Sequence, residues 1–218
     1  MFRNLFSDRP RPPFYRPYKD RTADFLYNLL FCDNPDLFRN EKEDASARSI
    51  ALSDTATREM LGTVAGNPAN ESRVRALAFN RLRAMHAPVP AKQLLGTIIE
   101  FPLENGLDTL AAFADGRVRY INQTGQPGIF ERAPADVFAK ANHLIRVSQL
   151  AVDQHGPSDE SRRPPPEGEL LRLSFLVSDG LYFGEGSYEA FMDDPAGEPV
   201  LTAGGELLVQ LVDTVVNT

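Results

Sequence analysis

Apolar residues follow two different spacings along the chain, and the change from one to the other falls near residue 92. Within 70–86, Val74, Ala78 and Leu82 recur at four-residue intervals, which place them on one face of a helix. Asn70 precedes this run and is expected to cap the helix. After residue 92 the apolar residues come in short runs separated by turn residues, a pattern typical of strands. The sequence therefore predicts helices first and a sheet afterwards.

Turn signals divide the second part of the chain into hairpins. Asx-Gly pairs favour the tight turns that join antiparallel strands, because both residues tolerate a positive φ. Another cluster of turn residues, TGQPG at 124–128, separates two further strand-like runs. These signals predict an antiparallel meander of three or four strands and a later hairpin. The three pairs are Asn105-Gly106, Asp115-Gly116 and Asp179-Gly180.

The second of these turns sets the expected orientation of an arginine. If Asp115 and Gly116 are the two central residues of the turn, Arg119 lies opposite Ala112 and Tyr120 points to the other face. Asp115 itself is then expected to serve the geometry of the turn. The same counting at the other two turns places apolar side chains on both faces of the strands, so each face needs a cover of helices.

Two later helices are expected to form one of these covers. The segment 134–152 and the last segment, 199–216, each carry an apolar stripe at helical spacing. The helices of the first part are expected to cover the other face. The predicted fold class is therefore α+β: an antiparallel meander sheet of five to six strands with N-terminal helices, one helix after the meander and a C-terminal helix packed on it.

Composition divides the chain further. Residues 1–21 form an arm rich in proline and aromatic residues, with six basic against two acidic residues. Residues 22–90 are expected to be a helical N-terminal region, and 91–218 to hold the sheet and two helices in one compact domain with 22–90. Residues 155–169 include three consecutive prolines and few apolar residues, which predicts an internal linker on the surface.

The balance of charge and cysteine limits the possible partners and the compartment. The chain of 218 residues is acidic, with a formal net charge of -7. An acidic protein has no overall attraction to phosphates or anionic lipids, so neither nucleic acid nor a membrane is expected as a partner. The sequence has no apolar run long enough for a membrane span, and charges and prolines interrupt its N-terminus before a secretory signal develops. Cys32 is the only cysteine, which excludes an internal disulfide and favours a cytoplasmic location.

Residue types that carry chemistry are few and scattered. None of the three histidines lies in a helical metal-ligand pattern such as HExxH, so a metal site would need residues that are distant in the sequence. Cys32 follows apolar residues and is expected to be a buried, unreactive thiol. The Asp193-Asp194 pair precedes a proline and is expected to form a turn. We therefore predict no catalytic residue, no metal site and no cofactor. The histidines are His86, His143 and His155.

The most informative single position is Arg119. If its face of the sheet is covered, its guanidinium needs a carboxylate or an anionic ligand, and Glu104 and Asp108 are near enough along the sheet to be considered. In the alternative interpretation, Arg117 and Arg119 lie in water on an edge strand. The candidate residues for binding a ligand or a partner are Arg117, Arg119 and Tyr120 in the hairpin, and Phe14, Tyr15 and Tyr18 in the arm.

Two classes of function remain open. The leading hypothesis is a non-enzymatic cytoplasmic protein-interaction or regulatory protein that binds another protein, or a second copy of itself, through the arm or a partly covered sheet face. One form of it is an immunity-type protein, since such proteins are often small and acidic and neutralise basic toxins. The alternative is a small-ligand-binding protein or an enzyme, in which Arg119 anchors an anion between the sheet and the N-terminal helices. A pocket that brings together Arg119, a tyrosine and a carboxylate would favour this alternative.

Overall fold

The structure is a computed structural model, and it describes residues 14–39, 46–158 and 162–216. Within these residues, short helices come first, and the sheet with its later helices follows. The helical segments of the first part are α1 (Arg21–Leu30), η1 (Pro35–Phe38), α2 (Ala47–Leu52), α3 (Arg58–Gly66) and α4 (Ser72–Ala84). The second part holds β1 (Leu94–Leu103), β2 (Gly106–Phe113), β3 (Val118–Ile121), β4 (Pro127–Phe130), α5 (Ala135–Gln154), β5 (Leu171–Val177), β6 (Gly180–Gly186), α6 (Tyr188–Met192) and α7 (Gly197–Val216).

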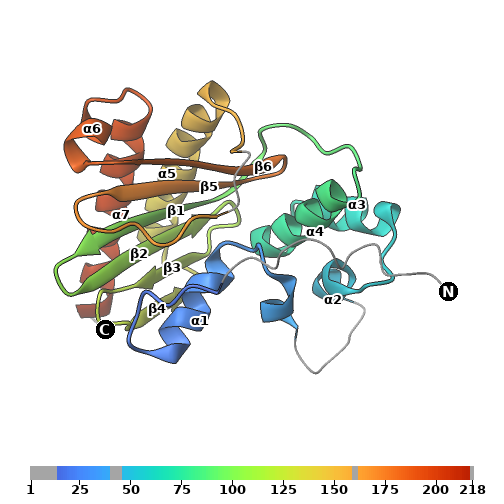
Figure 1. The fold of residues 1–218 in the computed structure, drawn as a ribbon, viewed down its shortest axis with the longest axis horizontal. Coiled ribbons are helices and arrows are strands. Elements are labelled where there is room, and N and C mark those ends of the chain that lie inside the picture. The colour runs from blue at the N-terminus through green and yellow to red at the C-terminus, as the bar shows by residue number, and fades with distance from the viewer. Residues whose placement is uncertain (1–13, 40–45, 159–161, 217–218) are drawn as a thin grey trace.

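The six strands in the described part of the chain form one sheet in the order β4-β3-β2-β1-β5-β6, and every neighbouring pair is antiparallel. Strands β1 to β4 are the predicted meander. After α5 the chain returns to the far side of β1, where β5 and β6 add a second hairpin (Figure 1). The predicted α+β fold, with its antiparallel sheet, N-terminal helices, helix after the meander and C-terminal helix, is confirmed.

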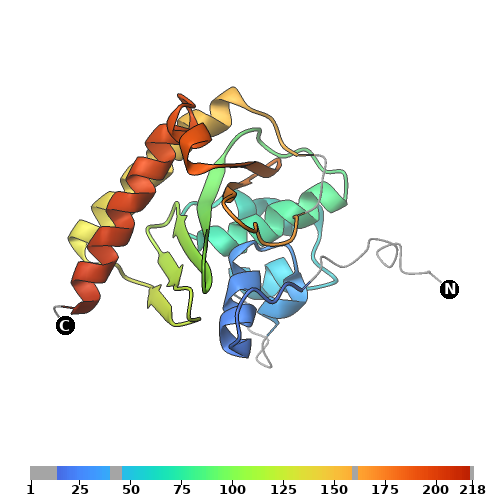
Figure 2. The same ribbon diagram turned by 60° about the vertical axis from the view of Figure 1, so that its left-hand side comes forward.

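Helices cover both faces of the sheet (Figure 2). α5 and α7 pack side by side on one face, and α1 to α4 form the layer on the other. Side chains alternate between the two cores along each strand: Ile98 and Phe113 face the N-terminal helices, and Ile99 and Leu110 face α5 and α7. Both faces are therefore buried, as strands that are apolar on two sides require.

The turn between β2 and β3 is longer than predicted. The N–H of Phe113 donates to the carbonyl of Arg117 at 3.0 Å, which leaves three residues in the loop rather than two. The last of the three, Gly116, has a φ of +82°, the left-handed conformation that closes a three-residue hairpin loop.

The extra loop residue shifts the pairing of β2 with β3 by one position. Arg119 pairs with Ala111 rather than with Ala112. Because side chains alternate along a strand, a shift of one residue turns Arg119 and Tyr120 to the faces opposite to those predicted. Arg119 lies on the side of the N-terminal helices, and Tyr120 packs on the side of α5 and α7.

The other two hairpins keep their predicted faces although their turns also differ. Leu103 pairs with Gly106, and Val177 pairs with Gly180, so each glycine ends the loop instead of forming its centre. Each pairing therefore moves by two residues from the predicted one. A shift of two residues leaves every side chain on its predicted face.

The start of α4 is capped differently from the prediction. Its N-cap residue is Glu71, whose side chain makes no cap hydrogen bond. Asn70, the predicted cap, donates instead to the carbonyl of Val64 in α3 at 2.9 Å. The five-residue helix α6 has no counterpart among the predicted elements. None of the described helices is long and apolar enough to cross a membrane.

Candidate functional site

The described part of the N-terminal arm, from Phe14 onward, packs on the domain. Tyr18 is buried, and its hydroxyl shares a hydrogen bond of 2.8 Å with the hydroxyl of Thr109 on β2. Tyr15 is half-buried, and its N–H donates to the side chain of Asn28 on α1 at 3.1 Å. Phe14 remains 41% exposed. Two of the three predicted aromatic residues therefore hold the arm in place, while residues 1–13 lie outside the described residues.

Arg119 is buried and paired. Its guanidinium forms an ion pair with Glu131 and donates hydrogen bonds to two carbonyls of β3 and β4. Arg117 binds the same carboxylate at 2.7 Å. Of the two interpretations given to Arg119, the covered one is correct, but the carboxylate is Glu131 and not Glu104 or Asp108.

Charge pairing, not ligand binding, explains the surroundings of Arg119. Burial pushes the pKa of Glu131 up, but the hydrogen bond from Arg117 and the charges of both arginines outweigh it, so the pKa of Glu131 is lowered. Burial lowers the pKa of Arg119. The hollow beside this guanidinium, against α1 and β4, has a volume of about 10 Å³, the space of a single water molecule.

Tyr120 takes part in a separate set of contacts on the other side of β3. Its hydroxyl donates to the carboxylate of Asp108 at 2.7 Å, and the same carboxylate accepts the N–H of Gln123 at 2.6 Å. Burial, the hydrogen bond to Asp108 and its charge raise the pKa of Tyr120. Arg119 and Tyr120 therefore do not converge on one site.

The segment 155–169 runs over the surface for most of its described length, but it places one charged side chain in the core. Arg162 is 5% exposed, and its guanidinium lies 4.3 Å from the centroid of the Phe31 ring. It donates to the carboxylate of Asp33 at 2.7 Å and to the side chain of Asn28 at 2.9 Å. Burial raises the pKa of Asp33, and the charge and hydrogen bond of Arg162 offset part of that rise. The segment predicted as a surface linker is thus fastened to the end of α1.

A buried carboxylate on β1 belongs to the same group of charges. Glu100 has no exposed surface and accepts a hydrogen bond of 2.7 Å from the hydroxyl of Tyr27. Its other oxygen lies 3.8 Å from Arg172 on β5. Burial raises the pKa of Glu100 to about 6, while the hydrogen bond from Tyr27 and the charges of Arg172 and Arg162 limit the rise. We call these four residues, Tyr27, Glu100, Arg162 and Arg172, the charged core.

The charged core was not predicted, although two of its residues leave a visible signal in the sequence. Glu100 interrupts the apolar run TIIEFPL, and Arg172 interrupts LLRLSFLV. A charged residue within a strand that is apolar on both faces must be buried with a partner. The third charge could not be found this way, because Arg162 lies in a segment that has no periodic pattern.

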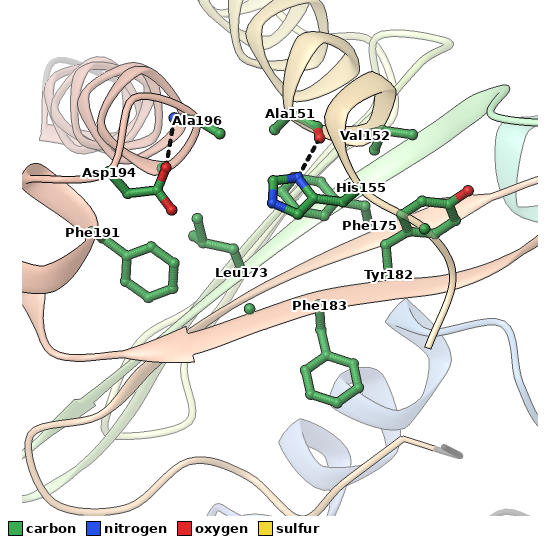
Figure 3. A pocket seen from close by; sticks show the side chains of 13 residues that line it. Ala151, Val152, His155, Leu173, Phe175, Tyr182, Phe183, Phe191, Asp194 and Ala196 are labelled. Carbon is green, nitrogen blue, oxygen red and sulfur yellow. Dashed lines mark hydrogen bonds between the residues drawn. The ribbon is translucent and has the colours of Figure 1, made fainter. Parts of the chain in front are cut away.

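A hollow of about 190 Å³ lies on the other side of the sheet (Figure 3). It is bounded by the C-terminal end of α5, by β5 and β6, and by the turn from α6 into α7. Leu173, Phe175 and Tyr182 line it from the sheet, and Phe191 lines it from α6. The ring of Phe183 points away toward the opposite face of the sheet. The lining is therefore largely apolar.

Two polar side chains lie at opposite sides of this hollow. His155 places Nδ1 2.8 Å from the carbonyl oxygen of Ala151. Since a carbonyl only accepts hydrogen bonds, Nδ1 carries a proton and Nε2 of the neutral ring is an acceptor. Asp194 accepts the N–H of Ala196 at 2.8 Å through one carboxylate oxygen. Such a site can hold a small apolar molecule that donates hydrogen bonds.

Neither polar residue was predicted to line a site. His155 appeared in the linker, and Asp194 in a turn before a proline. Asp194 does lie in the turn between α6 and α7, and it lines the hollow as well. The fold brings the two together because α5 and α7 run side by side, a pairing that sequence spacing does not specify.

Other chemistry finds little support in the part of the chain that the structure describes. No group of three His, Cys, Asp or Glu side chains in these residues has the arrangement of a metal site. Cys32 is 1% exposed, and burial raises the pKa of its thiol. A buried thiol with a raised pKa is a poor nucleophile.

Comparison with known proteins adds no functional information. No protein-family model, no curated protein and no solved structure matches this chain. Function is therefore inferred from the surfaces and contacts of the chain itself.

Proposed function

We propose that this protein is a non-enzymatic cytoplasmic protein-interaction or regulatory protein, and that it binds an acidic surface of another protein. The proposed contact surface is a set of exposed basic and aromatic side chains at the start of the described chain, which we call the basic face. The observation that carries the proposal is that these side chains are exposed on a segment that the buried residues Tyr18 and Ala23 hold on the domain. The basic face consists of Phe14, Arg16, Lys19, Arg21 and Phe25.

Buried residues hold the basic face in a fixed geometry. Tyr15 and Tyr18 alternate with the exposed residues of the arm and pack on the domain. On α1, Arg21 and Phe25 are four residues apart and so share one side of the helix, where Phe25 is 40% exposed. An ordered surface of aromatic and arginine side chains loses little entropy on binding, and these residue types dominate the energetics of protein interfaces.

Charge indicates the chemistry of the partner. Residues 1–21 carry six basic and two acidic residues, in a chain whose net charge is -7. A basic patch on an acidic protein favours a partner with a local negative charge, because complementary potentials speed association and select the orientation. A second copy of this chain satisfies that requirement. The immunity-type form of the proposal, in which the acidic part neutralises a basic toxin, is supported by composition alone.

The sheet faces and the surroundings of Arg119 are less well suited to binding than the basic face. Helices cover most of both sheet faces, and among the described strand residues the large apolar side chains that stay exposed are Leu103, at the end of β1, and Ile129, on the edge strand β4. The alternative of an anion held by Arg119 is not favoured, because Glu131 pairs with the guanidinium and the adjacent hollow measures about 10 Å³. These contacts leave the basic face as the surface that best supports the proposal.

The test compares two charge reversals of equal size. In R16E/R21E the basic face changes sign, while R132E/R146E reverses two exposed arginines elsewhere on the surface. Each variant and the unaltered protein would be cross-linked to bound proteins in the cells that make it, and captured proteins would be quantified by mass spectrometry. Any candidate would then be purified, and its affinity measured at low and high salt.

The expected result is a partner that the unaltered protein and R132E/R146E retain and that R16E/R21E loses. Its affinity should fall as ionic strength rises, because exposed charges are screened over about 10 Å at 0.1 M salt. Equal capture by both variants, or the same oligomeric state and no captured protein for all three, would refute the proposal.

A further inference from the structure

We propose that the hollow beside His155 and Asp194 is a binding site for a small amine whose apolar part is about the size of one aromatic ring. The inference does not depend on the proposed protein interaction, because the basic face lies at the N-terminus and on α1, and the hollow lies on the other side of the sheet (Figure 3). Three features carry it: the volume of the hollow, its apolar lining, and the hydrogen-bonding character of its two polar side chains.

The volume suits one ring and a short chain. The hollow measures about 190 Å³, whereas an apolar cavity of about 150 Å³ in another protein holds benzene. Space for larger bodies is limited by Phe191 on one side and by the sheet on the other. Gly184 contributes to this space: a Cβ there would lie 3.4 Å from the Phe191 ring, so a larger residue would occupy the hollow without displacing backbone.

The lining favours an apolar body with a cation at one end. Phe175 and Tyr182 are 8% and 2% exposed, and they present aromatic surface together with the aliphatic side chain of Leu173. Aromatic faces attract an ammonium group through their quadrupole, and more strongly where water is excluded. The hydroxyl of Tyr182 lies 3.2 Å from a carboxylate oxygen of Asp179, to which it donates.

Both polar side chains call for a ligand that donates hydrogen bonds. Asp194 uses one carboxylate oxygen for the N–H of Ala196, and its other oxygen is directed toward the hollow. His155 donates Nδ1–H to the carbonyl of Ala151, so its neutral ring offers Nε2 as an acceptor. An ammonium group supplies several donors and a charge opposite to that of Asp194.

The helix ends around the hollow favour the same sign of charge. The C-terminal end of α5, with Ala151 and Val152, lines the hollow and carries the negative end of the helix dipole. The positive end of α7 is also near, but Asp194 already binds its first amide groups through side chain and carbonyl. A cation is therefore favoured over an anion at this position.

The test uses 2-phenylethylamine as the probe and ethylbenzene as its uncharged equivalent. Binding to the full chain would be measured by isothermal titration calorimetry and by chemical-shift changes near neutral pH. D194N removes the charge and keeps an oxygen that can accept the N–H of Ala196, so the start of α7 remains capped. D193N is the matched control, since Asp193 is the neighbouring acidic residue and does not line the hollow.

The expected result is that the amine binds the unaltered protein and D193N alike, and that D194N weakens it about tenfold or more. Ethylbenzene should bind D194N as it binds the unaltered protein. A second variant, G184V, fills the hollow and should abolish binding of both probes. No binding of the amine to the unaltered protein, equal binding of the amine to D194N, or undiminished binding to G184V would each overturn the inference.

Discussion

The two sides of the sheet are filled by different chemistry. On the side of α5 and α7, the buried side chains of the described residues are apolar apart from hydroxyls such as those of Thr97 and Ser148. On the side of the N-terminal helices, the described residues bury charges of both signs among aromatic rings. These charged residues are Asp24, Arg75, Glu100, Arg119, Arg162 and Arg172.

Helix length explains much of the difference. α5 and α7 have 20 residues each and cover their face with long apolar stripes, whereas α2 and α3 have 6 and 9 residues. The C-terminal end of every helix leaves carbonyl groups without partners, so a layer of several short helices contains more of them than a layer of two long ones. Arginines satisfy several: Arg81 donates to the carbonyls of Ala51 and Ser53 at the end of α2, and Arg75 donates to that of Ala65 in α3. A layer of short helices thus needs long cationic side chains within it.

Among the changes that test this difference between the two sides, removing Arg162 is expected to lower the free energy of unfolding the most. R162A would leave the half-buried carboxylate of Asp33 without its ion-pair partner and would open space beside the ring of Phe31. Breaking a buried pair by removing one partner costs about 3–5 kcal/mol. The free energy of unfolding, measured by urea titration, should fall by that amount.

The neighbouring arginine is the control for this loss. Arg163 is exposed and lies over the Phe183 ring at 5.0 Å. R163A should cost less than about 1 kcal/mol, because an exposed cation–π contact contributes little. If both variants lost the same stability, burial of Arg162 would not be what stabilises the N-terminal side.

The next prediction concerns pH: a buried group that titrates on the N-terminal side should make stability depend on pH, whereas a buried hydroxyl on the other side should not. Folding raises the pKa of Glu100 from 4.5 to about 6, so the folded chain binds more protons than the unfolded chain between these values. The contribution of Glu100 to stability therefore falls as pH rises through this window, by about 2 kcal/mol. In E100Q that fall is absent. The stability of E100Q relative to the unaltered protein should increase by about 2 kcal/mol from below pH 4.5 to above pH 6.

The hydroxyl of Ser148, on the side of α5 and α7, provides the matching control for Glu100. The Oγ atom of Ser148 on α5 is buried and has no hydrogen-bond partner among the described residues. S148A removes a polar group that does not titrate, so its effect on unfolding should be the same at every pH. A constant difference between E100Q and the unaltered protein across pH 4.5 to 6 would show that Glu100 does not titrate in this window.

The side of the sheet that α5 and α7 cover with apolar residues was predicted well from the sequence. The segments 134–152 and 199–216 have continuous helical periodicity, and both became long helices, α5 and α7. Period-two alternation also placed Ile98 and Phe113 on one face, because turn errors of two residues do not change a face. Where the error was one residue, at the turn of Gly116, the faces of β3 were wrong.

The candidate sites were less predictable because each joins residues that no local pattern connects. Arg162 meets Asp33 across 129 positions of sequence, and Arg119 meets Glu131 through the register of β3 with β4, in which Arg119 lies opposite Ile129. His155 and Asp194 share a hollow through the packing of α5 beside α7. Propensity and spacing fix the elements, whereas loop length and helix packing decide which polar groups meet.

The smallest predicted effect concerns Asp115, which connects the sheet to the N-terminal helices. Besides accepting the N–H of Arg117 within its turn, its carboxylate accepts the N–H of Ser72 at 2.7 Å, and its own N–H donates to the Ser72 hydroxyl at 3.0 Å. A residue of the hairpin therefore caps α4, which has no side-chain cap of its own. D115A should lower the free energy of unfolding by about 1–2 kcal/mol, the usual cost of losing an N-cap.

Two further variants decide whether the cap causes that loss. D115N keeps an oxygen that can accept the Ser72 N–H, so it should retain most of the stability. Asp136 is the counterpart on the other side of the sheet: it lies exposed in the first turn of α5, which the sheet does not cap, and D136A should cost about 0.5 kcal/mol or less. Equal losses for D115A and D136A in urea titrations would mean that the bond from hairpin to α4 adds nothing. The expected gap between them would instead show that the layer of short helices depends on the sheet for its caps, whereas the layer of long helices does not.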